Sequence, residues 1–240
     1  LWQYGIMNPH VTWTNMAITQ SGSMENIGMG TLYETIDEQF VERYFDTAEQ
    51  GGDLYKCLYQ GLPADMTQFE NYGIETPAWT PTYDLKTNKK KSTHESLKNL
   101  ITTLNSSSLS KDKFASVVDI DNFMYYCAVS YMVGNCDDLR NNYNNSYIYF
   151  RADTGEMMVI PYDGDRGLGI NVWNPTGHGM TKDDPFTKQA LGNNSTQKSP
   201  LFLKSVCSGG FFVNEYTEAL KDVDASERLT NAFFTESFNL

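Results

Sequence analysis

The chain is poor in basic residues and in long apolar runs, and both shortages limit what it can do. Its 240 residues include 18 Lys and Arg against 30 Asp and Glu, a formal net charge of −12. Because phosphate backbones and anionic membranes attract Lys and Arg, we expect no nucleic-acid partner. No apolar run reaches the roughly 18 residues of a transmembrane helix, so we expect no membrane span. The acidic surface suits divalent cations or basic protein substrates, and it equally suits solubility alone.

Cysteine is scarce as well. The four cysteines, Cys57, Cys127, Cys136 and Cys207, form no Cys-x-x-Cys pair. Their spacing fits neither a zinc site nor a disulfide framework. The cysteines therefore do not indicate whether the protein works in a reducing or an oxidising compartment. Cys127 falls inside an apolar helical run, where we expect a small core side chain. Aromatic residues are plentiful, with 15 Tyr and 13 Phe, which favours a packed interior or a groove for planar ligands.

Hydrophobic periodicity and turn residues predict a chain that mixes strands and helices. The expected strands are residues 11–19, 27–35, 54–58, 147–151 and 157–161. The expected helices are residues 37–45, 93–104, 123–133, 202–206 and 212–223. The helix at 123–133 is apolar on all sides and should be buried, with Asp119 or Asp121 as its cap. Residues 60–92 are expected to be irregular, and residues 171–198 a long loop.

Acidic and amide side chains gather on both sides of the last predicted hairpin. Asp137 and Asp138 follow the buried helix, whereas Asp163 and Asp165 follow the second strand of the hairpin. If residues 163–165 are extended, both of their carboxylates point the same way. Oxygen ligands arriving from both sides could hold one or two hard cations. The alternatives are an Asx-rich loop with an exposed acidic turn, or a calcium loop, although the remaining EF-hand spacing is missing.

The order of these residues is that of a phosphoryl-transfer site. An Asp, an Asn a few residues later, a hairpin and then an Asp beside glycines is the order found in protein kinases. There, one Asp orients or deprotonates the attacking hydroxyl, while an Asn and a second Asp hold the metals that bridge the phosphates.

These segments resemble the CotH family of atypical protein kinases. The resemblance rests on Asp137, on Asn-Ser-Tyr-Ile-Tyr at 145–149 and on Pro-Tyr-Asp-Gly-Asp-Arg-Gly-Leu-Gly at 161–169, with supporting matches at 30–40, 52–56, 199–202 and 211–216. It covers about residues 1–222. Tyr162 stands where the family usually has Trp, and the stretch from Asp137 to Asn145 is longer than expected.

The resemblance implies a fold and a set of site residues. The expected fold is α+β, protein-kinase-like and two-lobed, in a single domain over residues 1–240. Residues 1–58 would be the remainder of an incomplete N-terminal lobe with the hinge, and residues 59–240 a helical C-terminal lobe with the metal-site hairpin. The implied roles are catalytic for Asp137, with Asp138 as its competitor; metal binding for Asp163, Asp165 and Asn145; and nucleotide binding for Asn145, Asp165 and Glu34.

Two of these positions carry competing interpretations. Glu34 would lie near the adenine at the lobe junction, or it is a strand-end acid that caps the following helix. Lys56 could substitute for the basic residue that grips the nucleotide phosphates, but it matches a different segment of the family, so we expect a strand-end surface lysine. In the family, the basic residue that should grip the nucleotide phosphates lies in the first strands of the N-terminal lobe. We expect those strands to be missing from this sequence.

The implied activity is transfer of the ATP γ-phosphoryl group to Ser or Thr of a Ser/Thr-rich protein. Mg²⁺ is the expected metal, with Mn²⁺ or Ca²⁺ as alternatives. The family also implies an extracytoplasmic location, secreted or in the bacterial spore coat. One rival is a catalytically inactive kinase-like binding module of a larger extracellular or surface protein, and another is a calcium-stabilised structural domain. The oligomeric state is not predicted.

Overall fold

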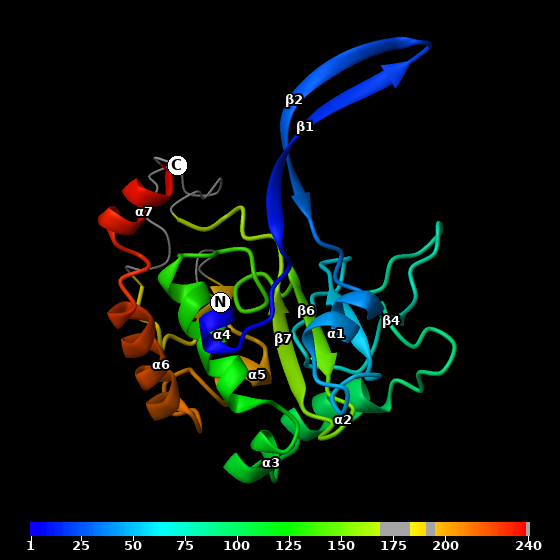
Figure 1. Ribbon diagram of the computed structural model, residues 1–240. Helices are drawn as coiled ribbons and strands as arrows, with labels where there is room; N and C mark the ends of the chain where they lie inside the picture. Colours follow the sequence, from blue (N-terminus) through cyan, green and yellow to red (C-terminus); the bar gives the residue numbers. More distant parts are fainter. Residues whose placement is uncertain (169–182, 191–194, 239–240) are drawn as a thin grey trace.

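The computed structural model describes residues 1–168, 183–190 and 195–238, which form an α+β fold (Figure 1). The strands are β1 (Val11–Gln20), β2 (Ser23–Tyr33), β3 (Leu54–Cys57), β4 (Tyr72–Gly73), β5 (Tyr83–Leu85), β6 (Ser146–Phe150), β7 (Met157–Pro161), β8 (Gln189–Ala190) and β9 (Ser195–Thr196). The helices are a 3-10 turn, η1 (Trp2–Tyr4), and then α1 (Glu38–Tyr44), α2 (Glu95–Leu104), α3 (Lys111–Ala115), α4 (Ile120–Met132), α5 (Pro200–Leu203), α6 (Val213–Ala225) and α7 (Asn231–Phe238). Gly169 and most of the expected loop at 171–198 lie outside the described residues.

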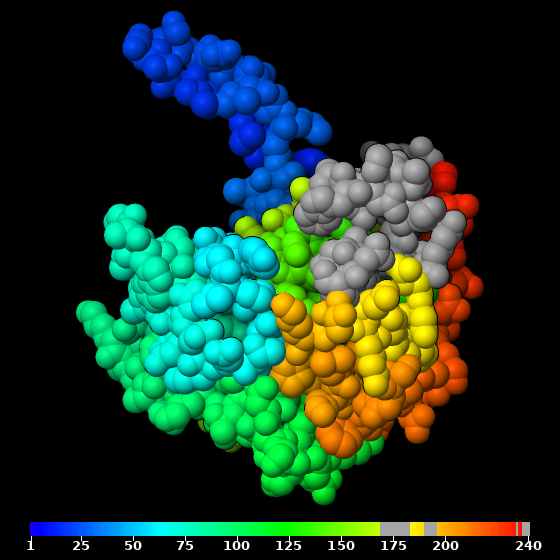
Figure 2. Space-filling view, turned by 180° about the vertical axis from the view of Figure 1, so that it is seen from behind, coloured from blue at the N-terminus to red at the C-terminus, as the bar shows by residue number. Residues whose placement is uncertain are grey.

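A two-stranded antiparallel ribbon, β1 with β2, projects from the rest of the protein (Figure 1, Figure 2). The strands pair from Val11 with Tyr33 to Gln20 with Ser23, as the predicted hairpin requires. Gly22 takes a φ of 81° in the connecting turn, a conformation that costs glycine little. The ribbon carries large apolar side chains in solvent, so it is not part of either hydrophobic core described below.

The central sheet has five strands in the order β4-β5-β3-β6-β7 and is covered on both faces. One face meets the main core, which includes Tyr55, Leu100, Phe123, Ile148, Val159, Phe202 and Tyr216. The other face meets the α1 core, which consists of Ile36, Phe40, Val41, Phe45, Leu54, Tyr147, Tyr149, Met158 and Ile160. Successive strand residues alternate between the two cores. Because both faces are covered, β6 and β7 read as continuous apolar runs rather than alternating ones.

Carboxylate caps start the two helices that matter most for the site. The Asp37 side chain accepts hydrogen bonds from the backbone amides of Gln39 and Phe40 at the start of α1. The Asp119 side chain accepts from the Asn122 amide at the start of α4. Of the two candidate caps for the buried helix, the structure therefore selects Asp119.

A buried asparagine of α4 forms hydrogen bonds with β7, the last strand of the sheet. The Val159 amide of β7 donates to Asn122 Oδ1 at 2.7 Å, and Asn122 Nδ2 donates to the Val159 carbonyl at 3.3 Å. Beside this pair, the Met157 amide donates to the Val117 carbonyl at 2.9 Å. The backbone groups of β7 that face away from β6 thus find partners without another strand, as buried backbone groups must. The contact fixes α4 and β7 against each other.

Several elements differ from the sequence-based expectations. The region expected to be irregular, residues 60–92, contains β4 and the fully buried β5, which pairs antiparallel with β3. The 5-residue helix α3, which the Ser110 side chain caps, and the 8-residue helix α7 were not expected. Helix α5 begins at Pro200 rather than at residue 202, since proline suits the first helical position.

All four cysteines are free and buried, which confirms Cys127 as a core residue. Burial raises the pKa values of the Cys57 and Cys127 thiols. Among the described helices, none has the length and apolar character that crossing a bilayer requires.

Replacing the asparagine that joins α4 to β7 should cost stability. We expect Asn122→Ala to lower the free energy of unfolding by about 2–4 kcal/mol, because the amide and carbonyl of Val159 would be left buried without partners. Chemical denaturation followed by circular dichroism measures the change. The matched control is Asn99→Ala, which removes an exposed asparagine of α2 and should change stability by no more than about 0.5 kcal/mol. Equal losses in the two variants would contradict this role for Asn122.

Candidate active site

The start of β6 and the ends of β3 and β7 lie side by side at one end of the strands of the central sheet. This end of the sheet is called the acidic edge below. Ser146, the first residue of β6, pairs with Cys57 at the end of β3 and with Pro161 at the end of β7. Asn145 directly precedes β6, and Asp163 lies two residues beyond β7. The antiparallel register therefore brings these two predicted site residues to the same edge, although 18 positions separate them in the sequence.

The loop that follows α4 delivers Asp137 to the same place. Its carboxylate accepts hydrogen bonds from Asn142 Nδ2 at 2.7 Å and from Asn145 Nδ2 at 3.1 Å. Asn145 Nδ2 also donates to the Asp137 carbonyl at 3.0 Å. The predicted pair of Asp137 and Asn145 is thus in direct contact, and the Asp137 side chain remains partly exposed.

Asp138 points the opposite way, into the protein. Its side chain accepts hydrogen bonds from the Ser130 hydroxyl, from Asn141 Nδ2 at 2.8 Å and from the Arg140 and Asn141 amides at 3.0 and 2.9 Å. Burial raises the pKa of the Asp138 carboxyl, and these hydrogen bonds oppose the shift. With 2% of its surface exposed, Asp138 organises the loop and offers no carboxylate oxygen to a substrate.

The turn after β7 is not extended, in contrast to the geometry considered from the sequence. Asp163 has a φ of 56° and Asn145 a φ of 49°, both in the left-handed region that few residues other than glycine adopt. The Gly167 amide donates to the Gly164 carbonyl at 3.1 Å, and the Leu168 amide donates to the carbonyl of Val133 beyond α4. Left-handed residues cluster at functional sites, where the surrounding structure holds them in place.

Asp163 is partly buried and feels the charges of its neighbours. Burial, together with the charges of Asp165 and Asp137, raises the pKa of the Asp163 carboxyl, while Lys56 and Arg166 oppose the shift. The Asp165 side chain is 57% exposed and lies 3.5 Å from Arg166 Nε. The described residues hold no preassembled group of three His, Cys, Asp or Glu side chains that could bind a metal. The donor chemistry nevertheless suits a hard divalent cation, whose charge would relieve the repulsion among these acids.

Lys56 borders this edge and is less exposed than the expected surface lysine. It is half-buried, and its ammonium lies 4.4 Å from the centre of the Tyr162 ring and 5.8 Å from that of Tyr147. Burial and the charge of Lys86 lower the pKa of Lys56, whereas Asp163 and Asp84 raise it. The two-residue period of β3 puts Lys56 on the face opposite Tyr55, but the sequence does not reveal that this face meets the turn after β7.

Glu34 lies at the base of the ribbon, where it binds α1 without capping it. Its carboxylate accepts hydrogen bonds from the Tyr44 hydroxyl at 3.0 Å and the His10 amide at 3.1 Å, and it pairs with Arg43. Burial alone would favour the neutral acid, but these contacts lower the pKa of Glu34. Because Asp37 is the α1 cap, the alternative in which Glu34 caps the helix is wrong.

A hollow of 490 Å³ lies beside Glu34 and includes His10, Leu32 and Tyr33 among its lining residues. The Tyr33 ring lies 6.4 Å from the Tyr162 ring, measured between their centres. Since Tyr162 directly precedes Asp163, this aromatic contact links the ribbon base to the acidic edge.

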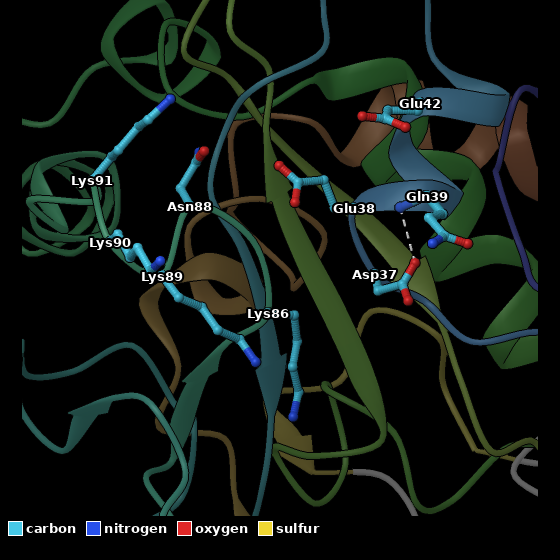
Figure 3. A pocket seen from close by; sticks show the side chains of 9 residues that line it. All are labelled: Asp37, Glu38, Gln39, Glu42, Lys86, Asn88, Lys89, Lys90 and Lys91. Atoms are coloured by element: carbon cyan, nitrogen blue, oxygen red, sulfur yellow. Dashed lines mark hydrogen bonds between the residues drawn. The ribbon is translucent and has the colours of Figure 1, made fainter.

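A second hollow, of 690 Å³, opens between α1 and the basic loop that follows β5 (Figure 3). One wall carries Lys86 and the lysines at 89–91, and the other carries Asp37, Glu38 and Glu42. The three consecutive lysines are exposed, as expected of a solvated surface run. Lys86 instead pairs with the buried Asp84 and is thereby held next to Lys56.

The whole chain was compared with known proteins. The model of one protein family, described as CotH kinase protein, matches residues 2–239, which is nearly the whole chain. A search of curated proteins found no match.

The adjacent aspartates should differ sharply when each is replaced. We expect Asp138→Ala to lower the free energy of unfolding by about 3 kcal/mol, because several buried donors would lose their acceptor. Asp137→Ala removes a partly exposed carboxylate and should cost at most about 1 kcal/mol. Urea denaturation of the two variants in parallel makes the comparison. A greater loss in the Asp137 variant would reverse the assignment of the structural role.

Proposed function

The chain belongs to the CotH kinase protein family, and from that premise we propose that it is an ATP-dependent protein kinase. Its substrates would be Ser/Thr-rich spore-coat or secreted bacterial proteins, which implies an extracytoplasmic location. The observation that carries the proposal is the contact of Asp137 with Asn145 at the sheet edge where Asp163 also lies. These are the residue types, in the chain order, that phosphoryl transfer uses.

In the proposed reaction, Asp137 receives the substrate hydroxyl. Its carboxylate accepts the hydroxyl proton while the substrate oxygen forms a bond to the γ-phosphorus and the bond from that phosphorus to the β–γ bridging oxygen breaks. The products are the phosphorylated side chain and ADP. Hydrogen bonds from Asn142 and Asn145 hold the Asp137 carboxylate in position. Asp138 supports the same loop from inside, so we assign catalysis to Asp137 alone of the two.

The remaining acids of the edge would hold the metal. Asp163, with Asn145 and Asp165, supplies oxygen ligands for Mg²⁺, or for Mn²⁺ or Ca²⁺. When bound, the cation neutralises charge on the phosphate oxygens. The raised pKa of the Asp163 carboxyl, which burial causes and the charges of Asp165 and Asp137 increase, supports this assignment.

The nucleotide base would occupy the hollow at the ribbon base. Glu34 and Tyr33 line that hollow, and the contact between Tyr33 and Tyr162 leads from it towards Asp163. In this arrangement residues 1–58, which include the ribbon, would contribute to a nucleotide-gripping lobe. Residues 59–240 form the lobe that carries the catalytic and metal-binding side chains.

The exposed ribbon favours one alternative, a catalytically inactive binding module. Trp13 and Met29 are 71% and 72% exposed, and several neighbouring apolar side chains are exposed too. Apolar surface of this kind is typical of a protein-binding site. In that case the family fold would recognise a partner without transferring phosphate.

Metal binding can be tested without any reaction. We expect millimolar Mg²⁺ or Mn²⁺ to raise the unfolding temperature of the wild type, because the cation binds only the folded state. At a concentration 100 times Kd, such binding adds about 2.7 kcal/mol to the free energy of unfolding. Asp163→Asn should lose most of this gain, because one charged ligand is removed. Differential scanning calorimetry with and without EDTA gives the shifts. Asp224→Asn, on the exposed surface of α6, is the control and should respond like the wild type.

Phosphorylation itself is the decisive test. We expect metal-dependent transfer of label from γ-³²P-ATP to a Ser/Thr-rich protein substrate, detected by gel autoradiography. Asp137→Asn and Asp163→Ala should each reduce the rate about 100-fold or more, since one loses the proton acceptor and the other a metal ligand.

The control for this assay is again Asp224→Asn, which should retain the wild-type rate. A folded wild-type protein that transfers no label with Mg²⁺, Mn²⁺ or Ca²⁺ would refute the kinase proposal. That result would favour the binding module instead.

A further inference from the structure

Lys56 belongs to a row of side chains that crosses the central sheet on its α1 side. In the strand register it lies between Asp84 of β5 and Tyr147 of β6, and Tyr147 in turn pairs with Ile160 of β7. The neighbouring row, which contains Leu54, Tyr149 and Met158, lies in the α1 core. The row with Lys56 is the one nearest the sheet edge where Asn145 and Asp163 meet.

The ammonium of Lys56 is held in place but is not neutralised. Tyr162 and Tyr147 approach it with their rings, at 4.4 and 5.8 Å from the ring centres. Such contacts position a cation without removing its charge. Within the described part of the chain Lys56 makes no ion pair, whereas the adjacent Lys86 is paired with Asp84. The row therefore presents one available positive charge beside the acidic edge.

We propose that Lys56 binds the phosphates of the nucleotide, a role that rests on the proposed kinase function. Its side chain approaches from β3, on the sheet itself, and so does not depend on the ribbon. Tyr162 lies between the hollow beside Glu34 and the acidic edge. Its ring contacts Tyr33, which lines that hollow, and Lys56 on the sheet. A nucleotide whose base lies beside Tyr33 and whose phosphates reach Asp163 would pass this ammonium.

A structural role as a counter-ion for Asp163 is the competing explanation. The charge of Asp163 does influence Lys56, yet the two side chains form no ion pair, and the ammonium is placed against the aromatic rings. The two roles predict different behaviour towards ligands. A phosphate-binding lysine discriminates ATP from adenosine, whereas a lysine that only positions Asp163 affects metal binding in the absence of nucleotide.

The test uses isothermal titration calorimetry on the whole chain. Wild type, Lys56→Met and Lys56→Arg are titrated with the magnesium complex of a non-hydrolysable ATP analogue, with adenosine, and with Mn²⁺ alone. Lys204→Met, which removes the charge of an exposed lysine, is the matched control. Thermal unfolding of each variant establishes that it is folded.

We expect Lys56→Met to weaken binding of the ATP analogue about 10- to 100-fold while adenosine binding stays within twofold of the wild type. Lys56→Arg should recover part of the loss because it restores the charge. Mn²⁺ binding without nucleotide should be equal or tighter in Lys56→Met, since a nearby positive charge has been removed.

Two other results would overturn the inference, and they can be told apart. If folded wild type binds the ATP analogue and phosphorylates protein, but Lys56→Met binds the analogue equally well, the assignment of Lys56 fails while the kinase function stands. Weaker Mn²⁺ binding with unchanged preference for the ATP analogue over adenosine would likewise make Lys56 a positioning residue for Asp163. A wild type that binds no nucleotide would refute the kinase function and the role of Lys56 together.

Discussion

The architecture depends on the hydrogen bonds between the buried Asn122 side chain and the backbone of β7. Helix α4 leads into the loop that carries Asp137, and β7 leads into the turn that carries Asp163. Because one amide side chain satisfies both the donor and the acceptor of Val159, the helix and the strand hold a fixed relative position. The two halves of the candidate site are therefore aligned by a contact in the protein interior, away from the acids themselves.

The face of the sheet towards α1 contributes both to a hydrophobic core and to the candidate site. The main core fills one face, and on the other face the α1 core includes the row of Leu54, Tyr149 and Met158 together with Tyr147 and Ile160 of the next row. The row with Asp84 and Lys56 borders the edge where the strand ends deliver polar groups. At that edge, burial and the charges of Asp165 and Asp137 raise the pKa of the Asp163 carboxyl, and perturbed pKa values of this kind cluster at functional sites.

Much of this arrangement could be predicted from local sequence, and the parts that could not depend on tertiary contacts. The ribbon, α4 and the β6–β7 hairpin have strong periodicity and clear turn residues, and the order of motifs along the chain indicates Asn145, Asp163 and the pair of Asp137 and Asp138 as candidates. Strand β5 was missed because it is three residues long within a stretch rich in Pro, Gly and Asn. Asp137 and Asp138 have the same local chemistry, and only the packing of α4 against the loop distinguishes an exposed carboxylate from a buried one. The position of Lys56 between Asp84 and Tyr147 likewise depends on the strand register.

The buried thiols make the protein a reporter of its own conformational openings. Cys57, Cys127, Cys136 and Cys207 lie in β3, in α4, beside Asp137 and after α5, and each is at most 2% exposed. A thiol reagent can react only when the local structure opens, and the high thiol pKa values make the closed state still less reactive. Labelling rates at the four positions would therefore record the opening free energy of four separate regions. Cys136, next to Asp137, would report on the loop that follows α4.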